Sequence, residues 1–112
     1  MKEFLFLFRR DYKTPEAQPT PEELKQHLEH WQVWFENLAK KGILARPLQR
    51  WDGQGKVLER GKSPVNGPFA EIKESIGGMI VISAADYEAA ENIAKDCPIF
   101  ELNGTVEIRM GL

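Results

Sequence analysis

The sequence predicts a single ferredoxin-like α+β domain over residues 1–112, with its main elements in the order β-α-β-β-α-β. Two segments have the apolar spacing of amphipathic helices, and each lies between segments that alternate like strands. The first and third main strands are apolar on both faces, as expected for central strands of a covered sheet. A chain of 112 residues suits one domain with one modest core.

The first strand and the first helix have recognisable boundaries. The strand is expected over Glu3 to Arg9, where three phenylalanines alternate with Leu5 and Leu7. After a polar loop, Thr20-Pro21-Glu22-Glu23 matches a capping box with proline at the first helical position. The helix is expected to end at Gly42, and its buried face is an apolar stripe at Leu24, Leu28, Trp31, Phe35 and Leu38.

The middle of the chain predicts an additional hairpin. Ile43 to Gln49 is expected as the second main strand, at a sheet edge or a bulge because it contains Pro47. Asp52 to Gly55 forms a turn, and Lys56 to Glu59 forms a short return strand. These two strands would pair as an exposed hairpin.

The second half of the chain supplies the remaining elements. Asn66-Gly67-Pro68-Phe69 predicts a rigid turn, followed by one helical turn over Ala70 to Glu74. The remaining elements are a strand over Gly78 to Ser83, a helix from the N-cap Asp86 to Pro98, and, after a turn at Asn103-Gly104, a last strand over Thr105 to Met110.

The two helices would cover only one face of this sheet. Leu5, Leu7 and half of the run from Met79 to Ile82 would then be exposed, which is too apolar a patch for a monomer. We therefore expect a second copy of the chain to pack sheet to sheet, as a homodimer of the two-sheet α/β-barrel kind. The alternative is that the hairpin or the C-terminal segment folds over this face.

Composition and missing motifs exclude several classes of protein. Fifteen Lys and Arg against seventeen Asp and Glu give a net charge of −2, which argues against a broad nucleic-acid-binding surface. No apolar run is long enough to span a bilayer, and the N-terminal segment is expected to be a strand and not a signal peptide, so no membrane partner is expected. The low cysteine content leads us to expect a protein of the reducing cytoplasm. The single cysteine, Cys97, excludes an internal disulfide and is expected to be inert packing. Nucleotide-binding and hydrolase motifs are absent, and no cofactor is predicted.

Both histidines lie on the first helix, and two interpretations of His27 remain open. It flanks the apolar stripe beside Trp31, where a half-buried imidazole can act as an acid or base near neutral pH. The alternative is a structural histidine that hydrogen-bonds a backbone carbonyl. Glu23, His27 and His30 have a helical spacing that could hold a metal, but the usual zinc motif is absent and no metal site is predicted.

Two arginines and two tryptophans are further candidates. Arg9 ends a central strand on the face assigned to the dimer, and it is a candidate clamp for a carboxylate or phosphate. Arg10 is expected at a solvated strand end. Trp31 is expected mainly in the core, whereas Trp51, beside a turn, is a candidate to line a cleft or the dimer rim.

The segment from Asn66 to Glu74, followed by Ile76-Gly77-Gly78, resembles the DGPF family of YCII-related proteins. Their hallmark is D-G-P-F-A-E-x-K-E and then a Gly-Gly pair leading into a strand, and Asn66 stands here where the family has Asp. Similarity extends over nearly the whole chain, including His27-Leu28-x-x-Trp31-x-x-Trp34. The resemblance implies a ferredoxin-like domain that forms a dimeric α/β barrel. The resemblance also implies a cleft suspected of enzymatic activity, with a His–Asp pair. In this chain Asn66 would stand in place of the Asp of that pair.

Two functional hypotheses follow, and the sequence leaves open whether the protein is an enzyme. In the first, a cleft between the sheet and the first helix, near the dimer seam, binds a small molecule. His27 would be its acid or base and Arg9 its anion clamp, while its walls would include Asn66, Glu71, Trp31 and Trp51. In the second, the chain is a non-catalytic accessory or regulatory domain, since some family members are linked to sigma-factor-type regulators. A pocket that contains both His27 and Asn66 would favour the first hypothesis.

Overall fold

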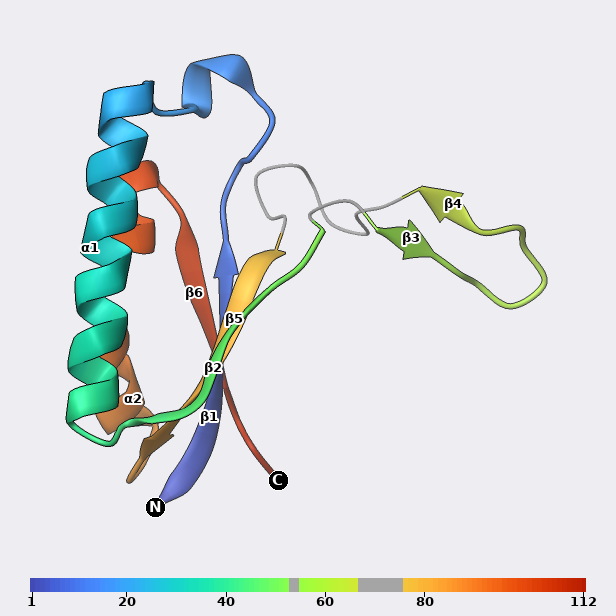
Figure 1. Ribbon diagram of the computed structural model, residues 1–112. Helices are drawn as coiled ribbons and strands as arrows, with labels where there is room; N and C mark the ends of the chain where they lie inside the picture. The colour runs from blue at the N-terminus through green and yellow to red at the C-terminus, as the bar shows by residue number, and fades with distance from the viewer. Residues whose placement is uncertain (53–54, 67–75) are drawn as a thin grey trace.

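The computed structural model describes residues 1–52, 55–66 and 76–112. In these residues the main sheet is antiparallel, with the strand order β2-β5-β1-β6. Its strands are β1 (Lys2–Arg9), β2 (Leu44–Arg50), β5 (Ile76–Ala84) and β6 (Thr105–Met110). Helix α1 (Pro21–Lys40) connects β1 to β2, and α2 (Tyr87–Ala94) connects β5 to β6. Both helices lie on the same side of the sheet (Figure 1), so the predicted ferredoxin-like fold is confirmed.

The predicted helix starts are confirmed by their caps. The Glu23 N–H donates to the Thr20 hydroxyl at 3.2 Å, and the Thr20 N–H donates to the Glu23 carboxylate at 3.1 Å. These two bonds satisfy donors that every helix N-terminus leaves free. Asp86 caps α2 with one such bond, its side chain accepting from the Ala89 N–H at 2.9 Å.

The end of the second helix differs from the prediction. Helix α2 ends at Ala94 rather than at Pro98, and a short 3-10 helix, η3 (Pro98–Leu102), follows it. Proline pushes the residue before it into extended backbone, and Cys97 indeed has φ −66° and ψ 129°. Pro98 therefore starts a new helical turn instead of only ending the old one. Another 3-10 turn, η1 (Pro15–Ala17), lies in the loop before α1.

The additional hairpin also pairs differently from the prediction. Strand β3 (Lys56–Val57) pairs with β4 (Val65–Asn66) and not with β2, which pairs with β5 at the sheet edge. The chain reverses beyond β3, where the Lys62 N–H donates to the Glu59 carbonyl and Gly61 has φ +78°. The β3–β4 hairpin projects away from the sheet (Figure 1). The predicted helical turn over residues 70–74, and the part of the predicted turn beyond Asn66, lie outside the described residues.

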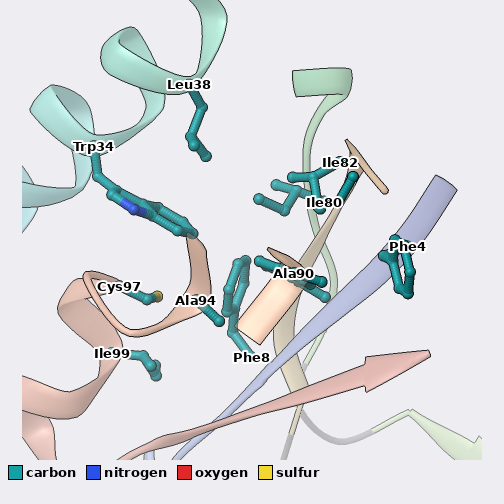
Figure 2. Close-up of a cluster of buried hydrophobic side chains, with 12 residues drawn as sticks. Phe4, Phe8, Trp34, Leu38, Ile80, Ile82, Ala90, Ala94, Cys97 and Ile99 are labelled. Carbon is teal, nitrogen blue, oxygen red and sulfur yellow. The ribbon is translucent and has the colours of Figure 1, made fainter. Parts of the chain in front are cut away.

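The core fills the space between the sheet and the helices. Phe4 and Phe6 of β1 and Ile82 of β5 have no exposed surface. Burying side chains of this size contributes about 1.5–3 kcal/mol each. Around them pack Phe8, Trp34, Leu38, Ile80, Ala90, Ala94, Cys97 and Ile99 (Figure 2).

The opposite face of the sheet is less exposed than the sequence suggests. Leu7 is only 8% exposed, and Leu5, Met79 and Val81 are half-buried rather than open. Leu7 lies between Met79 of β5 and Glu107 of β6 in the strand register, and these longer side chains shield it. The apolar patch is therefore smaller than expected, and the sheet-to-sheet homodimer stays a prediction.

Candidate functional site

A cavity of about 330 Å³ lies between the first half of α1 and the sheet, and we call it the aromatic cavity. The apolar stripe of α1 does not pack fully here, because Leu24 is 37% and Leu28 is 52% exposed. Further along the helix, Trp34 and Leu38 belong to the buried core, and Trp31 and Phe35 pack against it. The described residues that line the aromatic cavity are Phe8, Arg10, Tyr12, Leu24, His27, Leu28, Trp31, Phe35, Leu48, Arg50, Gly77, Gly78 and Ile99.

His27 is the buried histidine of this cavity, and its side chain is 6% exposed. Its Nδ1 atom lies 2.9 Å from Glu101 Oε1, and its Nε2 atom accepts a hydrogen bond from the Trp31 indole N–H at 2.8 Å. An indole nitrogen can only donate, so Nε2 carries the lone pair and Nδ1 carries the proton. His27 is thus held in one tautomer by a carboxylate on one side and an indole on the other.

Glu101 links this histidine to a second one. Its other oxygen lies 2.7 Å from Nδ1 of His30, which is more than half exposed. Burial acts to raise the pKa of the Glu101 carboxyl, but the hydrogen bonds from His27 and His30 outweigh it and hold that pKa below its ordinary value. Glu101 is therefore an ionised partner for His27 at neutral pH.

Glu101 is a functional candidate that was not predicted from the sequence. The residue lies 74 positions from His27, and η3 alone brings it to α1. The Cys97-Pro98 pair signals the start of that turn, but nothing in the sequence indicates which helix the turn contacts. The interpretation of His27 as bonded to a backbone carbonyl is wrong, since its partners are the Glu101 carboxylate and the Trp31 indole.

Arg10 forms the polar end of the aromatic cavity. It is 8% exposed, so the predicted solvated strand end is wrong. Alternation along β1 places Arg10 on the same face as Phe8, toward α1. Its Nη1 donates to the Asp11 carbonyl at 3.1 Å and to the Gln18 side-chain oxygen at 3.2 Å, and its guanidinium lies 4.1 Å from the centre of the Tyr12 ring.

Tyr12 and Arg50 complete this end. Burial raises the pKa of the Tyr12 phenol, and the charges of Arg10 and Arg50 partly oppose that rise. The Tyr12 ring occupies the space where a side chain at position 77 would begin, so Gly77 is what allows the ring to lie over the start of β5.

Arg9 lies on the opposite face of the sheet and is not among the described lining residues of the aromatic cavity. Its guanidinium pairs with Glu107 at 3.3 Å. The hydrogen bond from Arg109 and the charge of Arg9 lower the pKa of the Glu107 carboxyl. Desolvation acts in the opposite direction, but the pKa stays below its usual value. Of the two neighbouring arginines, Arg10 and not Arg9 faces the cavity.

The other predicted site residues divide between the cavity and the surface. Trp31 lines the aromatic cavity as well as contacting the core, and its indole ring packs edge-on against Phe8 with centroids 4.9 Å apart. Trp51 is 56% exposed, and Asn66 is exposed in β4 opposite Lys56. Neither lines the cavity among the residues described, so the pocket that would join His27 and Asn66 is not seen there. Glu71 lies outside the described residues.

The structure also places the residues considered for a metal site and the single cysteine. The Glu23 side chain caps α1, and no group of three or more His, Cys, Asp or Glu among the described residues is placed to hold a metal ion. A larger hollow of about 690 Å³ between α1 and α2 contains Cys97, but burial raises the pKa of this thiol to about 12, so it is protonated and a poor nucleophile. No helix within the described part of the chain has the length and apolar character needed to cross a membrane.

The profile of the YCII-related domain matches residues 6–110. The chain belongs to the YCII-related family. No curated protein matches this YCII-related chain in sequence.

Solved structures similar to this YCII-related chain include 5-chloro-2-hydroxyhydroquinone dehydrochlorinase (TftG) from Burkholderia phenoliruptrix AC1100, in complex with 2,5-dihydroxybenzoquinone. It is 14% identical, the match covers 96% of this chain and 90% of that one, and the TM-score is 0.45. The de novo designed protein Ferredog-Diesel is also similar, with 12% identity, 100% and 85% coverage and a TM-score of 0.40.

Proposed function

We propose that this YCII-related chain binds a small molecule in the aromatic cavity and that His27 transfers a proton to or from it. The observation that carries the proposal is the buried His27, fixed by Glu101 and lining a cavity that is otherwise mostly apolar. A mostly apolar cavity with a few convergent polar groups is the usual form of a small-molecule site.

The hydrogen bonds define how His27 would act. Its Nε2 lone pair takes a proton from the bound molecule. The imidazolium that forms keeps its Nδ1–H, which continues to donate a hydrogen bond to Glu101. The ionised Glu101 carboxylate stabilises that cation, which gives it the role of an orienting partner. When the proton returns to the molecule, the original tautomer is restored.

Trp31 controls access to Nε2. In the structure its indole N–H occupies the lone pair that the reaction needs, at 2.8 Å. Once Nε2 is protonated, the two N–H groups repel each other. The indole must then turn its hydrogen toward another acceptor, and the developing negative charge of the bound molecule is one such acceptor.

The same contact favours a second candidate function, a binding domain without catalysis. With both ring nitrogens already hydrogen-bonded, His27 can serve only to hold Trp31 as a wall of the cavity. In that case the ligand binds and is released chemically unchanged, as expected for an accessory or regulatory domain.

A thermal-shift screen of small aromatic and carboxylate metabolites tests the proposal, with wild type, His27→Ala and His30→Ala compared. His30→Ala is the matched control, because His30 also contacts Glu101 but does not line the aromatic cavity among the described residues. A ligand at 100 times its dissociation constant adds about 2.7 kcal/mol of stability. We expect stabilisation that His27→Ala abolishes and His30→Ala keeps.

Each ligand found is then incubated with the protein and followed by NMR for exchange of its protons or conversion. Conversion that depends on His27 supports the acid–base role. Binding without conversion supports the second candidate. Stabilisation that His27→Ala leaves unchanged would refute a site at this histidine.

A further inference from the structure

The guanidinium of Arg10 is buried at the aromatic cavity, and within residues 1–52, 55–66 and 76–112 no carboxylate pairs with it. Its acceptors are a backbone carbonyl and a side-chain amide oxygen, both uncharged. The neighbouring Asp11 feels the charge of Arg10, but its carboxylate accepts from the Lys13 and Thr14 N–H groups at 2.9 Å each. A charge in a buried position is costly unless a counter-ion or strong hydrogen bonds offset it.

A second arginine increases the positive charge at this end. Arg50 is the last residue of β2 and lines the same cavity, and its charge and that of Arg10 both act on Tyr12. In the described part of the chain no carboxylate forms an ion pair with either Arg10 or Arg50. Because both arginines line this end of the cavity, an anion bound there would be attracted by both charges.

The rest of the cavity fits an apolar body. Away from the arginines its walls include the rings of Phe8, Trp31 and Phe35. The aromatic rings favour a flat partner that can stack on them or meet their edges. A volume of about 330 Å³ is at the small end for ligand sites, which suits a molecule of one ring and its substituents.

From this arrangement we propose that the aromatic cavity selects small aromatic carboxylates, with Arg10 and Arg50 binding the carboxylate and the ring lying along Trp31 toward His27. Arginine suits this role because its planar fork of N–H groups can hold both oxygens of a carboxylate. The inference rests on the proposed function of the same cavity, and it adds the class of molecule that binds there.

NMR titration of the intact protein with benzoate, and with benzamide as its uncharged isostere, tests the inference. The chain has three tryptophans, so the indole N–H signals report on separate places. Trp31 lines the cavity, whereas Trp51 is exposed and serves as an internal control. We expect benzoate to shift the Trp31 signal with at least a tenfold lower dissociation constant than benzamide.

The arginine variants decide which side chains produce that preference. Arg10→Gln and Arg50→Gln should each raise the dissociation constant of benzoate at least fivefold and leave that of benzamide unchanged. Arg60→Gln removes the same charge in the exposed loop between β3 and β4 and should change neither. If Arg10→Gln fails to fold, Arg50→Gln still tests the inference, because Arg50 is exposed.

The outcomes separate this inference from the proposed function. Equal binding of benzoate and benzamide at Trp31 would overturn the carboxylate preference and leave the cavity as a binding site. A benzoate preference that survives both arginine variants would overturn the role of Arg10 and Arg50. If neither compound moves the Trp31 signal, the inference fails, and the metabolite screen with His27→Ala decides the proposed function independently.

Discussion

Glu101 ties η3 to α1, and replacing it with alanine tests that link directly. In Glu101→Ala the buried His27 keeps its Nδ1 proton but loses the carboxylate that accepts it at 2.9 Å. An unsatisfied buried donor costs about 1–3 kcal/mol. The lost contact with the exposed His30 adds less than about 1 kcal/mol. We therefore expect Glu101→Ala to lose about 2 kcal/mol at pH 7, a sizeable part of the roughly 5–15 kcal/mol that stabilises a domain.

The loss should depend on pH in a defined direction. The folded-state pKa of Glu101 lies below its ordinary value of 4.5, so folding favours the ionised carboxylate. The stabilisation from this group is therefore complete above the unfolded pKa and is lost as the pH falls through the folded pKa. Wild type and Glu101→Ala should differ most above pH 4.5, and the difference should shrink as the pH falls below that value.

Urea unfolding monitored by circular dichroism at pH 7, 5 and 3.5 measures this difference. Glu29→Ala is the matched control, because Glu29 is an exposed residue of α1 with no hydrogen bond or ion pair among the described residues. It should stay within about 0.5 kcal/mol of wild type. A Glu101→Ala variant as stable as Glu29→Ala at pH 7, or a deficit that stays the same at pH 3.5, would refute the reasoning.

Further predictions concern the core, a helix cap, a tight turn and the assembly. Phe6→Ala should lose about 3–5 kcal/mol in urea unfolding, because Phe6 is fully buried, and a loss below about 1.5 kcal/mol would contradict that. Thr20→Ala should lose about 1 kcal/mol, whereas Thr20→Ser, which keeps the cap, should not. Gly104→Ala should lose about 1–3 kcal/mol because its Cβ would lie 2.6 Å from the Arg9 carbonyl, while Gly111→Ala, with its nearest neighbour at 3.4 Å, should be tolerated. Sedimentation equilibrium should give twice the 12.8 kDa chain mass, and a value near 12.8 kDa would refute the homodimer.

The fold was predictable because its signals are local. The Thr20 capping box, the Asp86 cap and the strand alternation each specify an element within a few residues. Hairpin pairing was not predictable, because β3 had two possible partners and the reversal near Gly61 decided between them.

The candidate site could be predicted only in part. His27 stood out because it flanks an apolar stripe, but its partner Glu101 comes from the other end of the chain. Arg10 was misplaced although alternation along β1 already puts it on the Phe8 face. The half-open packing of Leu24 and Leu28, which leaves room for the aromatic cavity, depends on tertiary structure that a helical stripe does not encode.

The Tyr12 side chain fills the space that a side chain at position 77 would need, so the effect of a change at either position depends on the residue at the other. Any side chain at position 77 must displace the Tyr12 ring, and because Tyr12 is 38% exposed we expect the ring to move toward solvent. Gly77→Ala should therefore move the phenol off Arg10 and widen the mouth of the aromatic cavity, while a smaller residue at position 12 should make alanine at position 77 harmless. The two sites would then show strong epistasis in a double-mutant cycle. A larger residue at position 77 combined with a smaller one at position 12 would change which ligands can enter the cavity without altering His27 or Glu101.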